Sequence, residues 1–131
     1  MDHQEIRIVI LHRNRLFRES LALILGQQRS ISVARASAAL DQIREEPASL
    51  WPDLFILGFE APDCGGIEGV RRIRDISPES KILIIDVPDQ EADVLERRLG
   101  AVCRHSERDE AQTRGEEGLH AVIVSRRPAT P

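Results

Sequence analysis

Residues 52–66 read Pro-Asp-Leu-Phe-Ile-Leu-Gly-Phe-Glu-Ala-Pro-Asp-Cys-Gly-Gly, and this stretch decides the fold. Residues 54–57 form an apolar run without a polar interruption, which is typical of a parallel strand buried on both faces. The run stops at Gly58 and a Pro-containing turn, so we predict a central strand that ends there. In open parallel sheets, ligands bind where strands end at their carboxyl edge. Position 58 and the loop after it are therefore the first place to look for function.

The length and composition of the chain limit the classes of protein to which it can belong. With 131 residues, 41% of them hydrophobic and 31% charged, the chain has the profile of one globular domain that needs neither metal nor disulfide for its core. No apolar run approaches the roughly 18 residues that span a membrane, and residues 1–5 are too polar for a secretory signal. We therefore expect a cytoplasmic protein with no membrane partner.

Charge and side-chain chemistry argue against several functions. A net charge of −4 argues against a nucleic-acid surface, because such surfaces concentrate Lys and Arg. Cys64 and Cys103 lack metal-ligand or redox-motif spacing, so we expect reduced structural thiols. The sequence also lacks phosphate-binding glycine loops, nucleophile elbows and paired metal-binding histidines. We therefore expect no enzyme, no metal and no cofactor.

Strand and helix patterns alternate along the chain on both sides of the central run. Apolar β-branched runs predict strands, and apolar residues at helical spacing predict helices. The predicted strands cover residues 6–11, 31–36, 54–57, 81–87 and 101–103, and the predicted helices cover residues 15–28, 38–46, 66–77 and 89–99. Alternating units of this kind form a parallel sheet with right-handed crossovers. We predict a doubly wound α/β fold with five parallel strands in the order 2-1-3-4-5.

The C-terminal part of the chain is less regular. We expect a core over residues 1–107, a polar loop over 108–118, a possible fifth helix over 119–125 and a disordered tail over 126–131. Apolar residues within 119–125 keep a helical step, which favours a shortened or irregular helix. The β-branched run of residues 122–124 lowers helix propensity and leaves this assignment open.

Several segments resemble the response-regulator receiver domains of the CheY-like superfamily, and in particular the NarL/FixJ subfamily. The resemblance rests on the first strand and helix at Ile6–Leu21, on Pro52-Asp53, on Pro62, on the Gly66–Arg74 helix and on Gly100-Ala101. It covers roughly residues 6–107. It implies the same doubly wound fold and a role in two-component signalling.

The resemblance also implies a phosphorylation site, and this sequence departs from it at every position. The family uses an Asp after the third strand, two acids after the first strand that hold Mg²⁺, a Ser or Thr after the fourth strand and a Lys after the fifth. The matching residues here are Gly58, the pair His12 and Arg13, Asp86 and Glu107. With Glu60 they would form a degenerate pocket without a catalytic residue.

Arg13 has two interpretations. Its permanent charge lies where the family holds a divalent cation, so it could be a built-in cation bonded to Asp86, Glu60 or Glu107. Alternatively, Arg13 points into water beside a pocket that has only lost its original residues.

We interpret the chain as a pseudo-receiver that acts as a phosphorylation-independent protein interaction module. Its partner would be another protein or a second copy, and the expected partner surface comprises Arg97, Arg98, Arg104 and His105. Two alternatives remain: the N-terminal receiver part of a NarL/FixJ-type transcription regulator, and a small-anion-binding or enzymatic flavodoxin-like domain.

Overall fold

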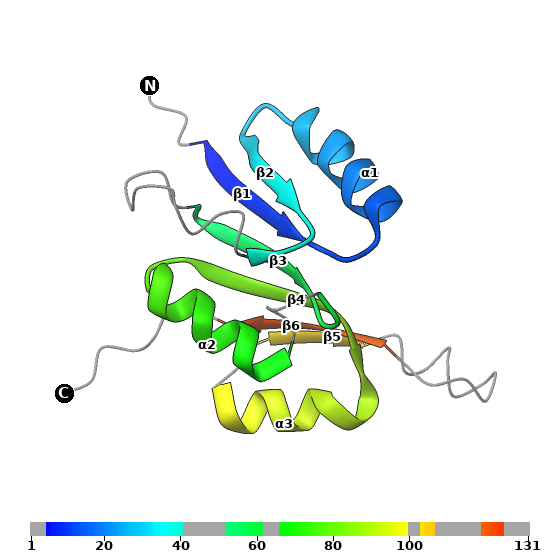
Figure 1. Cartoon of the computed structure of the whole chain (residues 1–131), viewed down its shortest axis with the longest axis vertical. Helices are drawn as coiled ribbons and strands as arrows, with labels where there is room; N and C mark the ends of the chain where they lie inside the picture. Colours follow the sequence, from blue (N-terminus) through cyan, green and yellow to red (C-terminus); the bar gives the residue numbers. More distant parts are fainter. Residues whose placement is uncertain (1–4, 41–51, 62–65, 100–102, 107–118, 125–131) are drawn as a thin grey trace.

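The structure is a computed structural model that describes residues 5–40, 52–61, 66–99, 103–106 and 119–124. Six strands form one sheet in the order β2-β1-β3-β4-β6-β5 (Figure 1). The strands are β1 (Ile6–Leu11), β2 (Ile31–Ser37), β3 (Leu54–Gly58), β4 (Lys81–Pro88), β5 (Cys103–Ser106) and β6 (Leu119–Val124). The described helices are α1 (Arg15–Gly26), α2 (Gly66–Ile76) and α3 (Asp89–Leu99).

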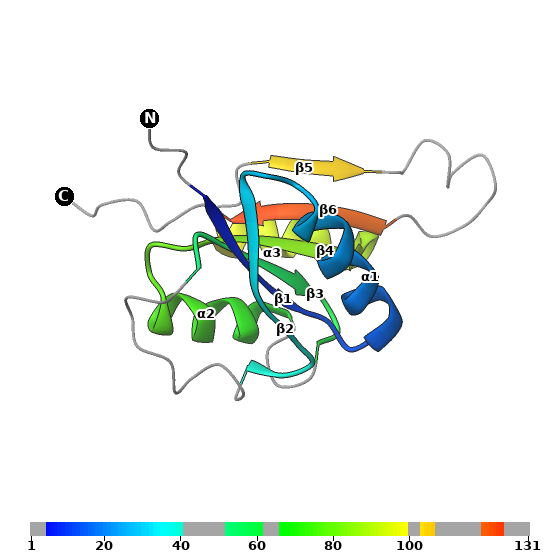
Figure 2. The ribbon, with the colours of Figure 1, turned by 90° about the horizontal axis from the view of Figure 1, so that it is seen from above.

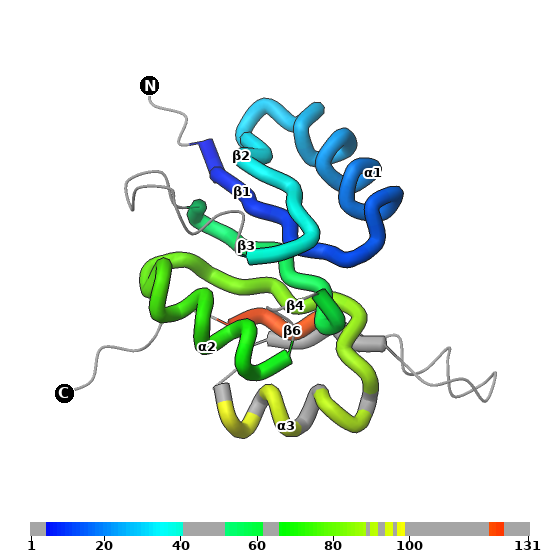
Figure 3. Tube along the Cα trace, viewed as in Figure 1, coloured from blue at the N-terminus to red at the C-terminus, as the bar shows by residue number. Residues whose placement is uncertain are grey.

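The predicted fold class is confirmed. Strands β2, β1, β3 and β4 pair in parallel in the predicted order, and without β6 the sheet reads 2-1-3-4-5. The central strand runs between β1 and β4, as its apolar run predicts. The tube in Figure 3 shows the chain passing from β4 directly into α3.

Residues 119–124 form strand β6, so the possible fifth helix over 119–125 is wrong. Strand β6 pairs antiparallel with β4 on one side and antiparallel with β5 on the other. Figure 2 shows β5 beyond β6 at the edge of the sheet. The β-branched run is the physical reason, because its side chains pack well on a pleated surface and lose rotamer freedom in a helix.

The two faces of the sheet are covered unequally. Alternate residues of β1, β3, β4 and β6 point to the side of α2 and α3, where they form the larger core cluster with Val70, Ile73 and Leu95. The other residues form a smaller cluster on the side of α1, built on Ile8, Ile10 and Ile56. Helix α1 packs on β1 and β2, whereas α3 packs on β4 and β6 (Figure 1).

Some expectations lie outside the described residues. They are most of the helix predicted over 38–46, the polar loop over 108–118 and the tail over 126–131. Among the residues that the structure describes, no helix is long and apolar enough to cross a membrane.

Candidate functional site

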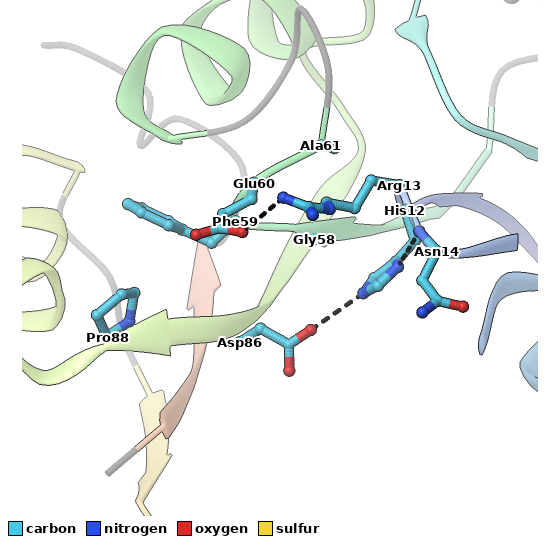
Figure 4. A pocket seen from close by; sticks show the side chains of 9 residues that line it. All are labelled: His12, Arg13, Asn14, Gly58, Phe59, Glu60, Ala61, Asp86 and Pro88. Carbon is cyan, nitrogen blue, oxygen red and sulfur yellow. Dashed lines mark hydrogen bonds and ion pairs between the residues drawn. The ribbon is translucent and has the colours of Figure 1, made fainter. Parts of the chain in front are cut away.

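A pocket opens at the carboxyl edge of the central strands, where β1, β3 and β4 end. It is a cavity of about 390 Å³ (Figure 4). Its lining comprises His12, Arg13, Asn14, Gly58, Phe59, Glu60, Ala61, Asp86 and Pro88. The parallel sheet thus brings together five of the six residues expected to form the degenerate pocket. The sixth, Glu107, lies outside the described residues.

The imidazole of His12 is held across the floor of this pocket. Its Nδ1 accepts a hydrogen bond from the backbone N–H of Asn14 at 3.0 Å, and its Nε2 lies 3.0 Å from Oδ2 of Asp86 (Figure 4). The ring also stacks on Phe17, with ring centroids 4.4 Å apart. With only 8% of the residue exposed, His12 is part of the packed structure rather than a surface side chain.

These contacts decide the tautomer of the neutral ring. A nitrogen that accepts an N–H bond carries no proton, so the single proton of neutral His12 lies on Nε2 and is donated to Asp86. The bond between Nε2 of His12 and Oδ2 of Asp86 joins the ends of β1 and β4.

The segment that follows β1 holds His12 in place. The Nη1 of Arg18 donates to the carbonyl oxygen of His12 at 2.7 Å. Asn14 has extended backbone dihedrals and its Oδ1 accepts from the N–H of Phe17 at 3.0 Å, so it is the N-cap of α1. These roles of Asn14, Phe17 and Arg18 were not predicted. An Asn just before an apolar helical pattern is the cap signal that could have revealed the first of them.

Only glycine fits at position 58, because the ring of His12 occupies the space that a Cβ would need. A Cβ added at Gly58 would lie 2.7 Å from Cδ2 and 3.3 Å from Cγ of the imidazole. Real Cβ atoms essentially never approach so closely, and the two hydrogen bonds leave the ring little room to move. The ring therefore lies where the side chain of residue 58 would begin.

Asp86 reaches His12 because of an irregularity in β4. One extra residue in β4 between Ile84 and Val87 shifts its register against β6. Simple alternation after Ile82 and Ile84 would turn Asp86 into the core, but the bulge places Val87 there instead, at 0% exposure. The φ of Asp86 is 60°, a left-handed conformation that Asp tolerates better than most residues.

Arg13 pairs with Glu60 at the rim of the pocket. Its Nη1 lies 3.0 Å from Oε2 of Glu60, and about two thirds of both side chains are exposed to water. Arg13 thus bonds Glu60, one of the three carboxylates expected for a built-in cation. The pair is exposed to solvent, as the second interpretation expects. His12, rather than Arg13, is the residue that bonds Asp86.

We predict that the Arg13–Glu60 pair adds little stability. In a double-mutant cycle of Arg13→Ala and Glu60→Ala, the expected coupling free energy of unfolding is about 0.2–1 kcal/mol, because exposed ion pairs are screened by water and salt. Chemical denaturation at low and high ionic strength measures it, and the coupling should fall as salt is added. A larger coupling that does not respond to salt would contradict this expectation.

The remaining residues of interest lie elsewhere. Arg97 and Arg98 are exposed in the last turn of α3, and Arg104 and His105 belong to β5. Asp53 lies at the opposite end of β3, where its Oδ2 accepts from the backbone N–H of Arg7. Among the described residues, no group of three or more His, Cys, Asp or Glu side chains could hold a metal ion.

A doubly wound sheet in the order 2-1-3-4-5, with its polar residues gathered after β1, β3 and β4, defines the CheY-like class of α/β domains.

Comparison with known proteins gives the same class. The chain is 29% identical over 99 residues to protein-glutamate methylesterase/protein-glutamine glutaminase 3 of Leptospira interrogans, which covers 74% of this chain and 28% of that protein. It is 28% identical over 103 residues to the uncharacterized transcriptional regulatory protein YxjL of Bacillus subtilis, covering 78% and 47%. It is 26% identical over 92 residues to the transcriptional regulatory protein DegU of Brevibacillus brevis, covering 70% and 39%. No protein-family model matches the chain.

In its fold and in its relatives, the chain is therefore similar to response-regulator receiver domains. The chain spans less than half the length of each of the three relatives.

Proposed function

We propose that this domain is a pseudo-receiver: a receiver fold that is not phosphorylated and acts as a protein interaction module. The observation that carries the proposal is the contact between Gly58 and His12, because the imidazole takes the place of the side chain that receives phosphate in the family. Residue 58 itself has no nucleophile, and the neighbouring ring is hydrogen-bonded on both nitrogens.

The other parts of a phosphoryl-transfer site are replaced as well. The reaction needs cations that stabilise the charge of the transferring phosphoryl group. Here the carboxylate of Asp86 is bonded to His12, and the guanidinium of Arg13 is bonded to Glu60. Among the described residues that line the pocket, each charged side chain thus has a partner within the protein, which also argues against the alternative of a small-anion site or an enzyme.

The proposal predicts that the purified protein does not form an acyl phosphate. Incubation with acetyl phosphate and Mg²⁺ should leave the intact mass unchanged, because residue 58 offers no nucleophile and the carboxylate of Asp86 is held by His12. Intact-mass spectrometry measures this, with a receiver domain that has the acidic site as the positive control. A labile adduct on Asp86, Glu60 or His12 would overturn the proposal.

A longer parent protein is the second candidate, favoured by the relatives that are transcriptional regulatory proteins. In that case the domain would be the receiver part of a transcription regulator and would control DNA binding by another domain. Footprinting with the protein encoded by the complete reading frame tests this: protection of a specific DNA segment is expected, and binding without sequence preference would argue against it.

The partner surface of the interaction module is also a proposal. We propose that it comprises the basic end of α3, where Arg97 and Arg98 are exposed, and the residues Arg104 and His105 of β5. A cationic surface of this kind suits an acidic partner. Reversing the charge of Arg98 should then weaken capture of such a partner and lower the salt dependence of binding.

A further inference from the structure

The two hydrogen bonds of the His12 ring respond in opposite ways to protonation. In the neutral ring, Nδ1 accepts the backbone N–H of Asn14 at 3.0 Å, and Nε2 donates to the carboxylate of Asp86. In the protonated ring both nitrogens carry hydrogen, and neither can accept a bond. The contact with Asn14 then brings two donors together, whereas the contact with Asp86 becomes a charge-assisted hydrogen bond. Protonation thus favours one partner of the ring over the other.

The pocket gives the protonated ring room to leave Asn14. Phe17 stacks on the ring, with the ring centroids 4.4 Å apart, and Gly58 lies so close that no Cβ fits between them. His12 and Asp86 both line the cavity of about 390 Å³ (Figure 4). The side chain of Asp86 is 50% exposed, so it can follow the ring into this cavity.

The charged side chains of the described residues that line the pocket or bind His12 comprise two carboxylates and two guanidinium groups. Asp86 of β4 is bonded to the ring, and Arg18 of α1 donates to the carbonyl oxygen of His12 at 2.7 Å. Arg13, the next residue along the chain, is bonded at 3.0 Å to Glu60, which follows β3. The bond of Arg18 is made to the backbone and does not depend on the charge of the ring. Asp86 is therefore the group that holds the ring once it is protonated.

The bond from Asn14 to His12 ties the start of α1 to this ring. Asn14 is the N-cap of α1, because its Oδ1 accepts the N–H of Phe17 at 3.0 Å. The first turn of α1 carries Leu16 and Phe17, whose side chains are 76% and 40% exposed. The ring of His12 thus helps to position a cap that is followed directly by exposed apolar side chains.

We propose that His12 is a pH-sensitive latch between β4 and the N-cap of α1. The neutral ring holds both Asn14 and Asp86, whereas the protonated ring keeps Asp86, turns into the pocket and releases Asn14. Histidine is the side chain that ordinarily changes its charge between about pH 5 and pH 8, so the latch opens as the pH falls through this range. This inference goes beyond the proposed function, because it requires neither a partner protein nor the absence of phosphorylation.

Nuclear magnetic resonance of the isotope-labelled full chain, titrated from about pH 8 to about pH 5, tests the latch. At the start of the titration the ring nitrogens of His12 should show a proton on Nε2 only, and the amide proton of Asn14 should have the downfield chemical shift of a hydrogen-bonded group. As the pH falls, the amide signal of Asn14 should move upfield with the same midpoint as the ring nitrogens. The amide signal of Phe17 should follow, because its acceptor is the side chain of Asn14.

His12→Asn is the matched variant. Its Oδ1 can take the place of Nδ1 as the acceptor for the backbone N–H of Asn14, but it does not titrate. The amide signals of residues 14 and 17 should therefore lose their response to pH. His120→Gln, which removes a histidine of β6, should leave the response of the wild type unchanged.

Three results would overturn the proposal. They are an Asn14 amide signal that stays constant while His12 titrates, a His12 ring that stays neutral over the whole range, and a response that persists in His12→Asn. If His12→Asn does not fold, the comparison of the two midpoints in the wild type still decides the question. The titration contains no phosphate donor, so its outcome and the acetyl phosphate result are independent of each other.

Discussion

Replacing Gly58 by Ala should lower the free energy of unfolding by about 1–3 kcal/mol, the usual cost of adding a methyl group to a packed site. The added Cβ would lie 2.7 Å from Cδ2 of His12, so the ring must leave its place between Asn14 and Asp86. Urea denaturation of the wild type and the variant measures the loss. Gly58→Asp should cost at least as much and should not create a phosphorylation site, because His12 and Arg13 stand in place of the two acids that hold Mg²⁺ in the family.

Two comparisons make this prediction specific. Gly26→Ala is the matched control, because no atom lies within 4 Å of a Cβ at the end of α1, and it should be neutral or slightly stabilising. In a His12→Ala background, most of the cost of Gly58→Ala should disappear, since the atoms that it meets are gone. Additive effects of the two substitutions would show that residues 12 and 58 do not compete for the same space.

Replacing Val124 by Asp should cost on the order of 4 kcal/mol or more, enough to unfold much of the population of a marginally stable domain. Val124 belongs to β6, has no exposed surface and packs in the cluster on the side of α2 and α3. A carboxylate there would be buried without a partner. Circular dichroism and thermal melting would show the loss.

Ile123→Asp is the control for Val124→Asp. Ile123 is the neighbouring residue on the other face of β6, where it is only partly buried, so its replacement should cost much less. A helix over 119–125 would give the opposite result, because its apolar side would contain Ile123 and leave Val124 outside. Equal or reversed costs would contradict strand β6.

Local patterns were sufficient for most of the fold. The apolar runs at 6–11 and 81–87 predict strands whose observed bounds are Ile6–Leu11 and Lys81–Pro88. The predicted helix over 89–99 has the observed bounds Asp89–Leu99. Such runs are informative because a strand buried on both faces must be apolar throughout, and a helix on a sheet must be apolar along one side. The segment over 119–124 was ambiguous, because its helical spacing and its β-branched residues favour different structures.

The sequence by itself determined the class of fold and the edge at which the pocket lies, because periodicity and the end of the central strand depend only on neighbours along the chain. It also determined which residues replace the acids of the family. Only the tertiary structure decided what those residues do. The bond from His12 to Asp86 joins residues 74 positions apart, and the bulge that turns Asp86 toward His12 depends on the pairing of β4 with β6. The contact of His12 with Gly58 likewise exists only once β1 and β3 lie side by side.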